Sequence, residues 1–287
     1  MSRILEALRR AEQEHGAPAA PPTAEDDLAA LPELLRALQP RAAAPDRFAA
    51  CHYRPSLEHL LATDGHDRTA QAESFRVLRF RLEAWRGREP RKIVLIASSI
   101  PKDGKTVVAV NLARTLALTG ARVLLIDADL RKGGIHDLLE LKPDSGLAEV
   151  LQGNERWQGV CREVAPLGFC YLAAGRLPAN PAELLRSQRL RQTLQEATTI
   201  FDWIVVDSPP LVPFADARYL AALAHGVVLV ARDGWTPLPE LTKSLQALAS
   251  YPLVGLVMND SDEEPSSGYY ARYPLMAAVP MEESARA

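Results

Sequence analysis

The sequence predicts an α/β fold, a doubly wound and mainly parallel sheet with helices on both faces. Two observations lead to this prediction: short, continuous apolar runs alternate with helical stretches, and polar motifs follow several of the runs. A continuous apolar run is typical of a strand that is covered on both faces, as parallel strands are. The runs that we expect to be strands occupy residues 93–97, 123–127, 169–172, 203–207, 227–231 and 254–258.

The first apolar run leads into the motif SSIPKDGKT, residues 98–106, and then into a predicted helix over residues 106–119 that ends at Gly120. Successive backbone amides at such a strand-to-helix turn form a cradle for phosphate oxygens. Within it, Lys105 would place its ammonium on the β and γ phosphates, and the Thr106 hydroxyl would bind Mg²⁺. The sequence therefore predicts a P-loop NTPase-like fold. The expected nucleotide contacts are Pro101, Lys102, Asp103, Gly104, Lys105, Thr106 and Val107.

The motif departs from the common P-loop pattern at Ser99, where that pattern has glycine. Without the strand before it and the helix after it, Lys105 would be interpreted as a solvated lysine at the start of a helix. Acidic residues strengthen the nucleotide interpretation, because Asp127 and Asp207 each end an apolar run. Asp207 is the candidate Mg²⁺ ligand, with Asp127 as a second. Asp127 or Asp129 would accept a proton from an attacking hydroxyl. The alternative is that one of the three aspartates, Asp129 before the other two, only caps a helix or pairs with Arg131.

Composition limits the function classes. The chain has 287 residues, is 47% hydrophobic and carries a formal charge of −3, so we expect one principal domain and no nucleic-acid partner. Its three cysteines have no metal-site spacing, which favours reduced thiols. We see no apolar run of membrane-spanning length and no signal peptide, and therefore expect a cytoplasmic location.

The pattern predicts four segments. Residues 1–16 form an amphipathic helix that docks on a membrane protein's cytoplasmic tail, on lipid or on its own domain. Residues 17–70 are rich in alanine and proline and read as a tether with a short helix. The nucleotide-binding domain spans residues 71–260 and begins with a helix at 71–86, and residues 261–287 form a flexible tail.

The motifs together resemble one family. The loop running on to Asn111-Leu112-Ala113, the DADLR motif at 127–131 and the DSPP motif at 207–210 are similar to those of the bacterial tyrosine kinases of capsule and exopolysaccharide synthesis. Shorter matching segments lie at 146–151, 180–185, 216–217 and 254–259, so the resemblance covers residues 73–259. The chain departs from the family at Lys102, where glycine is usual, and at Gly133, where proline is usual.

The resemblance implies an ATP- and Mg²⁺-dependent tyrosine autokinase in which Lys105, Asp127 and Asp129 are catalytic. It implies that Glu73, Arg76 and Arg79 join subunits into a ring, although a solvated helix face has the same charge spacing. It also implies that Tyr269, Tyr270 and Tyr273 are phosphoacceptors in a neighbour's active site, the other interpretation being a tail that packs on its own domain. The expected activator is a separate membrane polysaccharide co-polymerase that recruits the kinase to the inner face of the plasma membrane.

Two other functions remain open on the sequence. Chromosome- and septum-positioning ATPases share this fold and act as dimerising switches, but they usually carry a loop lysine at the position of Ile100. A nucleotide-binding scaffold of a polysaccharide export complex, with weak turnover, is the other. Phosphate on the tail tyrosines distinguishes the kinase from the switch, and ATP turnover with and without an activator tests the scaffold.

Overall fold

The computed structural model of the chain describes residues 49–51, 70–165, 167–212 and 214–260. The predicted helix at 1–16, nearly all of the tether and the tail with Tyr269, Tyr270 and Tyr273 lie outside the described residues. Within them, no helix has the length and apolar character needed to cross a bilayer.

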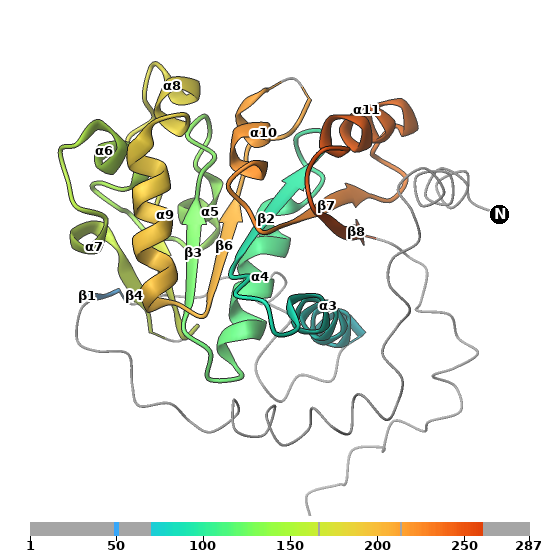
Figure 1. Cartoon of the computed structure of the whole chain (residues 1–287), viewed down its shortest axis with the longest axis horizontal. Coiled ribbons are helices and arrows are strands. Elements are labelled where there is room, and N and C mark those ends of the chain that lie inside the picture. The colour runs from blue at the N-terminus through green and yellow to red at the C-terminus, as the bar shows by residue number, and fades with distance from the viewer. Residues whose placement is uncertain (1–48, 52–69, 166, 213, 261–287) are drawn as a thin grey trace, which may run out of the picture.

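The described residues form an eight-stranded sheet in the order β1-β4-β5-β3-β6-β2-β7-β8 (Figure 1). Neighbouring strands are parallel except β4 and β5, which are antiparallel. The strands are β1 Ala49–Cys51, β2 Ile93–Ser98, β3 Val123–Asp127, β4 Arg162–Val164, β5 Phe169–Leu172, β6 Trp203–Asp207, β7 Gly226–Arg232 and β8 Leu253–Asn259. The predicted doubly wound, mainly parallel sheet is confirmed.

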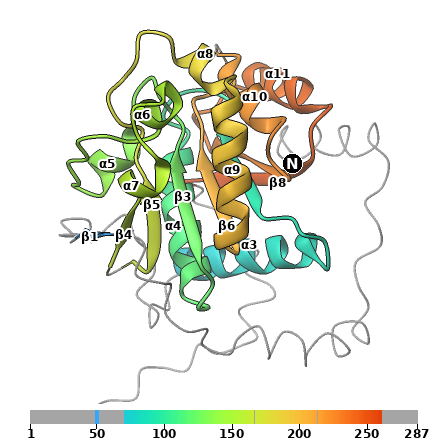
Figure 2. The ribbon, with the colours of Figure 1, turned by 60° about the vertical axis from the view of Figure 1, so that its left-hand side comes forward.

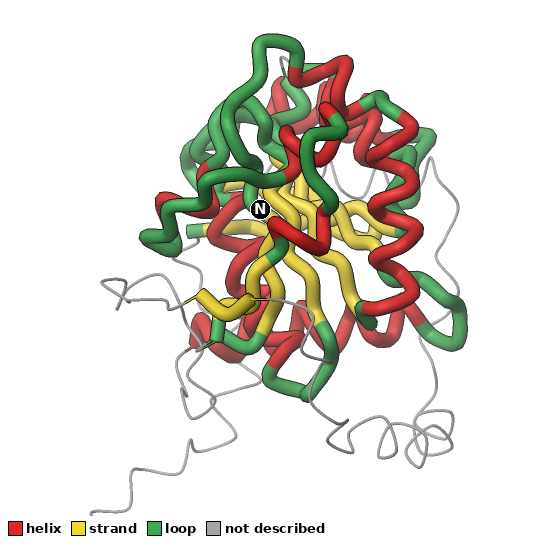
Figure 3. The backbone as a smooth tube through the Cα atoms, turned by 90° about the vertical axis from the view of Figure 1, so that its left-hand side faces the viewer, coloured by secondary structure: helices red, strands yellow, loops and turns green. Residues whose placement is uncertain are grey.

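Alternate residues of the central strands point into two apolar cores, one on each face of the sheet. In β2, Leu95 belongs to one core, whereas Val94 and Ile96 belong to the other. The first core is covered by α6 Leu147–Gln152, α7 Trp157–Val160, α8 Pro181–Leu185, α9 Gln188–Ile200, α10 Asp216–Ala221 and α11 Leu238–Leu248. The second is covered by α3 Ala70–Arg86, α4 Lys105–Ala117 and α5 Gly134–Leu138. Figure 2 shows α9 lying along β6, and Figure 3 shows helices on both sides of the sheet.

The predicted strands at 123–127, 169–172 and 203–207 match β3, β5 and β6, while β2, β7 and β8 extend slightly beyond their predicted ranges. The predicted helix at 106–119 runs from Lys105 to Ala117, so its end was placed two residues too late. The chain turns there, and Gly120, with φ +81°, donates its N–H to the carbonyl of Ala117 at 2.9 Å. The short strands β1 and β4 were not predicted, and β1 lies within the range assigned to the tether.

Candidate nucleotide site

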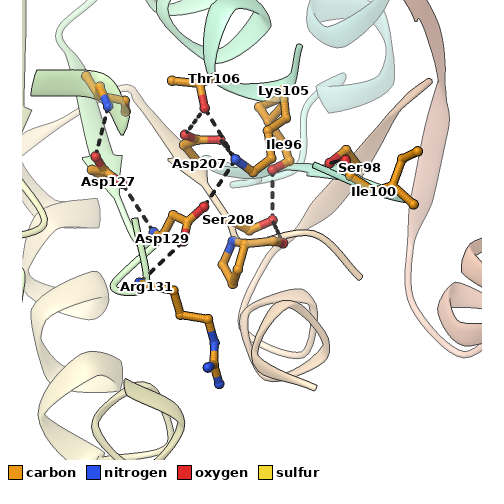
Figure 4. A network of polar contacts seen from close by, with 12 residues as sticks. Ile96, Ser98, Ile100, Lys105, Thr106, Asp127, Asp129, Arg131, Asp207 and Ser208 are labelled. Carbon is orange, nitrogen blue, oxygen red and sulfur yellow. Dashed lines mark hydrogen bonds and ion pairs between the residues drawn. The ribbon is translucent and has the colours of Figure 1, made fainter. Parts of the chain in front are cut away.

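The three sequence motifs meet at the carboxyl edge of the sheet. Strands β3 and β6 are paired with Asp127 opposite Asp207, and β2 pairs with β6 on its other side, with Ile96 opposite Asp207. The loop after β2 therefore begins beside Asp207 and leads into α4. Lys105 and Thr106 at the start of α4 point toward Asp207 and Asp129 (Figure 4).

The turn before α4 depends on Gly104. Its φ of +95° lies in the left-handed region, which an L side chain rarely adopts, and a Cβ at this position would collide with the side chain of Asn259. Asn259, the last residue of β8, donates its amide Nδ2 to the carbonyl of Asp103 at 3.1 Å. The first amides of α4 have no partner within the helix by geometry and can face an anion. The chain thus turns at Gly104 directly into α4, at the place where the sequence predicts a phosphate cradle.

Asp103 shapes the loop from within the protein. Its side chain is buried, and its two oxygens accept the N–H of Ile100 at 2.9 Å and the hydroxyl of Thr236 at 2.8 Å. Burial raises the pKa of Asp103, while these hydrogen bonds oppose the rise. Its carboxylate is already hydrogen-bonded within the protein, so the predicted nucleotide contact of Asp103 would be made by its main chain.

The remaining predicted nucleotide contacts lie around the same turn. Pro101 and Lys102 are exposed at the tip of the loop, and Val107 is half-buried in the first turn of α4. Lys102 has φ +71°, an uncommon conformation for a residue other than glycine. A lysine therefore adopts a backbone conformation that favours glycine, at the position where the resembling family has glycine.

Lys105 is surrounded by carboxylates. Its Nζ lies 3.2 Å from Oδ2 of Asp129 and 4.0 Å from Oδ1 of Asp207. Burial lowers the pKa of Lys105, but the charges of Asp207 and Asp129 outweigh this effect, and the pKa is raised. The lysine is therefore charged at neutral pH and is held at the point where the loop meets the two strand ends, which excludes a merely solvated lysine.

Asp207 is fully buried and incompletely paired. Its Oδ2 accepts the hydroxyl of Thr106 at 2.8 Å, whereas its Oδ1 has no hydrogen-bond partner. Burial raises the pKa of Asp207 to about 6, against the opposing effect of Lys105. An unsatisfied buried carboxylate oxygen beside a hydroxyl matches the chemistry of a Mg²⁺ ligand pair, because Mg²⁺ prefers oxygen ligands.

The described residues contain no group of three or more His, Cys, Asp or Glu side chains able to hold a metal ion. Thr106 and Asp207 alone provide two ligands, whereas Mg²⁺ requires six in an octahedral arrangement. In nucleotide sites the others are commonly phosphate oxygens and water. The residues present therefore fit a cation that binds together with a nucleotide.

The two acidic residues after β3 have different surroundings. Asp127 is fully buried, and its oxygens accept the N–H groups of Asp129 at 3.2 Å and Ile135 at 3.1 Å. Burial, with the charge of Asp207, raises its pKa well above the ordinary range. Asp129 instead faces Lys105 and accepts the N–H of Arg131 at 3.3 Å. The carboxylate of Asp127 organises its own loop, while that of Asp129 belongs to the charged network of the site.

The residues expected to join subunits lie on α3, away from this network. Glu73 and Arg76 form an ion pair at 2.8 Å, and Arg79 lies 3.9 Å from Glu83 on the next turn. Near the end of α3, Trp85 approaches Gly226 at the start of β7, which is the amino edge of the sheet. The expected helix is present, and its charges pair within the helix in the single chain.

Three polar residues that support the site were assigned no role in the sequence analysis. Thr236 holds Asp103, Asn259 packs against Gly104, and Asp216 accepts the side chain of Arg131 at 2.6 Å. Asn259 carried a local signal, since it ends an apolar run as Asp127 and Asp207 do, and Asp216 lay in one of the short segments that match the resembling family. Thr236 lies in the loop after β7 and Asp216 is the first residue of α10, and the side-chain partners of both depend on the fold.

Comparison with known proteins identifies the family. Residues 92–233 match the model of a family described as AAA domain. The tyrosine-protein kinase YwqD of Bacillus subtilis is 35% identical over 207 residues, covering 71% of this chain and 87% of that protein. The tyrosine-protein kinase etk of Escherichia coli K12 is 34% identical over 199 residues, which is 69% of this chain but 27% of that longer protein. The chain belongs to the bacterial tyrosine-protein kinase family.

Solved structures agree. The kinase domain of Escherichia coli ETK has a TM-score of 0.69 and 32% identity, covering 76% of this chain and 86% of that one. The BceF tyrosine kinase domain has a TM-score of 0.62 and 30% identity, covering 87% of this chain and 96% of that one. The cell division ATPase MinD of Pyrococcus furiosus, at 24% identity and a TM-score of 0.51, shares the fold. The described domain thus has the architecture of a bacterial tyrosine kinase domain.

Proposed function

We propose that the chain is an ATP- and Mg²⁺-dependent protein tyrosine autokinase of exopolysaccharide or capsule synthesis. One observation carries the proposal: Lys105 and Thr106, at the start of α4, contact Asp129 and Asp207 from two adjacent strands. A P-loop lysine, a metal-binding hydroxyl and two carboxylates are the groups that phosphoryl transfer needs, since its catalysis depends mainly on positioning and charge stabilisation. Because the chain belongs to the bacterial tyrosine-protein kinase family, we assign phosphoryl transfer to tyrosine to these residues.

The nucleotide-binding roles divide among residues on either side of the turn. The amides after Gly104 and the ammonium of Lys105 would bind the phosphates, and Thr106 and Asp207 would hold Mg²⁺. When bound, the cation neutralises charge on the phosphoryl group being transferred. The Oδ1 of Asp207 accepts no hydrogen bond, which supports its assignment as the metal ligand.

Asp129 is the better candidate for the residue that accepts the proton of the incoming tyrosine hydroxyl. Both oxygens of Asp127 already accept backbone N–H groups, and burial raises its pKa, which favours the protonated form. Asp129 is 4% exposed and carries its carboxylate next to Lys105. A general base must lie within reach of the proton that it removes, and Asp129 meets this condition better. Asp127 then acts on the reaction by holding the backbone of Asp129, or as the second metal ligand.

The tyrosines that accept phosphate in this proposal are Tyr269, Tyr270 and Tyr273 in the segment after β8. They would be modified in trans, within a ring-like assembly in which Glu73, Arg76 and Arg79 on α3 contact the next subunit. One relative is named succinoglycan biosynthesis transport protein ExoP, from Rhizobium meliloti, and this name supports a membrane co-polymerase as the activating partner. That partner would bring the kinase to the inner face of the membrane.

Mass spectrometry of the purified protein after incubation with Mg-ATP tests the function directly. We expect phosphate on the tail tyrosines of the wild type and none on Lys105→Met. Mixing Lys105→Met with a tail-truncated active chain should restore phosphate on the tail of the inactive chain, as transfer in trans requires. ATP hydrolysis without tyrosine phosphate would instead indicate a switch ATPase, and binding with little turnover, unchanged by a candidate activator, would indicate a scaffold.

A further inference from the structure

We infer that Arg131 and Asp216 form a positioning pair that fixes the carboxylate of Asp129 beside Lys105; this inference rests on the proposed kinase function. The pair links two loops that follow adjacent strands. Arg131 lies in the loop after β3, which also carries Asp129, and Asp216 lies in the segment after β6, which follows Asp207. The Nε of Arg131 and the Oδ2 of Asp216 are 2.6 Å apart.

Asp216 is placed for this ion pair and not for capping its own helix. Its side chain is 1% exposed, and a buried carboxylate is costly unless it is paired. It stands in the first turn of α10, but no side chain caps that helix by a hydrogen bond. Arg131 supplies the compensating charge, and one third of its side-chain surface (33%) remains exposed.

The guanidinium of Arg131 is held on a second side by an aromatic ring. It lies 4.0 Å from the centroid of Phe214, two residues before Asp216. A guanidinium that both stacks on a ring and pairs with a buried carboxylate has little freedom of orientation. The backbone of Arg131 is thereby fixed, and its N–H is the group that donates to Oδ1 of Asp129.

The loop that carries Asp129 is thus held both by contacts within the loop and by the ion pair with Asp216. On the inside, the carboxylate of Asp127 binds the N–H of Asp129, and the carbonyl of Asp129 accepts the N–H groups of Lys132 and Gly133. Closer to the sheet, the N–H of Ala128 donates to the carbonyl of Asp207 at 2.9 Å. On the outside, Arg131 ties the loop to Asp216. Figure 4 shows Arg131 extending from the far side of Asp129, opposite Lys105.

Loss of the ion pair between Arg131 and Asp216 should affect the chemical step more than nucleotide binding. The groups proposed to bind ATP and Mg²⁺ are Lys105, Thr106 and Asp207, and neither Arg131 nor Asp216 contacts them by an observed hydrogen bond or ion pair. A misplacement of about 1 Å at a reacting group can reduce the rate by about 10²-fold. We therefore expect Arg131→Gln to lower kcat for tyrosine phosphorylation by about 10- to 100-fold, with KM for ATP within about threefold of the wild type.

The chain offers a matched control at the opposite edge of the sheet. Arg122, just before β3, pairs with Asp202, just before β6, at 3.2 Å, and its side chain is 31% exposed. This pair joins the same two strands with the same residue types, but it lies at their amino ends. Arg122→Gln should lower the thermal midpoint as Arg131→Gln does, while kcat stays within about twofold of the wild type.

The experiment compares kcat, KM for ATP and the thermal midpoint for the wild type, Arg131→Gln, Asp216→Asn and Arg122→Gln, with phosphotyrosine as the readout. Asp216→Asn preserves the shape of the buried side chain, so it tests the pair even where Arg131→Gln folds poorly. A selective fall in kcat for the Arg131 and Asp216 variants supports the inference. Equal effects from Arg122→Gln, or a change confined to KM, would overturn it.

Lys105→Met in the same assay separates this inference from the proposed function. If Lys105→Met is inactive while the Arg131 and Asp216 variants retain the wild-type kcat, the positioning pair is wrong and the kinase assignment stands. If Lys105→Met phosphorylates its tail at the wild-type rate, the assignment of the loop itself is wrong.

Discussion

The phosphate loop lies between two buried aspartates that serve different ends. Asp103 and Asp207 are both fully inaccessible to solvent, and burial raises the pKa of each. On the β7–β8 side, both oxygens of Asp103 accept hydrogen bonds from the protein. On the β3–β6 side, Asp207 keeps one oxygen without a hydrogen bond.

The contrast shows how a structural carboxylate can be told from a functional one. Burial alone does not separate them, since a protein can bury a carboxylate that it satisfies fully. An unsatisfied buried oxygen costs stability, and such a cost is typical of a site that is completed by a ligand. Asp103 therefore stabilises the loop, whereas Asp207 keeps an oxygen that fits its proposed role as a cation ligand.

The same substitution at the two positions should separate these roles most strongly in activity. Asp207→Asn removes the charge proposed to hold Mg²⁺, and we expect tyrosine phosphorylation to fall by on the order of 10²- to 10³-fold. Asp103→Asn keeps the metal ligands, and we expect tyrosine phosphorylation to fall by less than about tenfold, through a higher KM for ATP. Steady-state kinetics over a range of Mg²⁺ concentrations provides the measurement. Equal losses for the two variants would remove the distinction.

Stability as a function of pH should depend on Asp207. Its pKa is about 6 in the folded protein and 3.8 as the ordinary value, so the folded state binds the proton more tightly. The free energy of unfolding from this group is therefore greatest below about pH 4 and decreases as the pH rises through about 6. A difference of about two pKa units corresponds to about 3 kcal/mol.

Chemical denaturation of the nucleotide-free protein at pH 4 and pH 7, for the wild type and Asp207→Asn, tests this dependence. The variant cannot ionise at this position, so its loss of stability between the two pH values should be smaller by up to about 3 kcal/mol. Asp127, which is also buried with a raised pKa, acts in the same direction, and because the charge of Asp207 is one cause of that raised pKa, Asp207→Asn lowers the contribution of Asp127 as well and adds to the difference between the two proteins. Parallel curves for the two proteins would mean that Asp207 is ionised throughout.

Asp103→Asn should instead destabilise the protein at pH 7. An amide offers one acceptor oxygen where the carboxylate offers two, and Asp103 binds both the N–H of Ile100 and the hydroxyl of Thr236. A buried donor left without its partner costs about 1–3 kcal/mol, and we expect a loss of about 1–2 kcal/mol in urea denaturation. Thr236→Val, which removes the hydroxyl that donates to Asp103, should also lower the free energy of unfolding. A more stable Asp103→Asn would place this residue in the same class as Asp207.

Much of the fold followed from sequence because the central strands are continuous apolar runs. β3, β5 and β6 have this pattern and were predicted residue for residue. Strands β1 and β4 have three residues each, and Arg162 and Glu163 in β4 give no apolar run. Their pairing at the sheet edge comes from tertiary contacts, which a local pattern does not contain.

The site was predictable where residues follow strands and less so where loops meet. Lys105, Thr106 and Asp207 were expected to lie together and do, because parallel strands bring their carboxyl ends to one edge. The sequence left the roles of Asp127 and Asp129 open, since their alternation on a strand end does not show which oxygens accept backbone N–H groups. The partners of Asp103 and Arg131 are distant in the sequence, Thr236 in the loop after β7 and Asp216 at the start of α10, and no sequence spacing encodes them.

The smallest expected effect concerns Lys102, which lies at the tip of the loop between the two aspartates. Its φ of +71° is unfavourable for a lysine and natural for glycine. Lys102→Gly should raise the free energy of unfolding by about 0.5–1 kcal/mol, after allowing for the larger entropy of glycine in the unfolded chain. Lys142→Gly is the control, because Lys142 is also exposed but does not have a positive φ, so glycine there should lower stability. Two variants that change stability in the same direction would mean that the loop does not hold Lys102 in a strained conformation in solution.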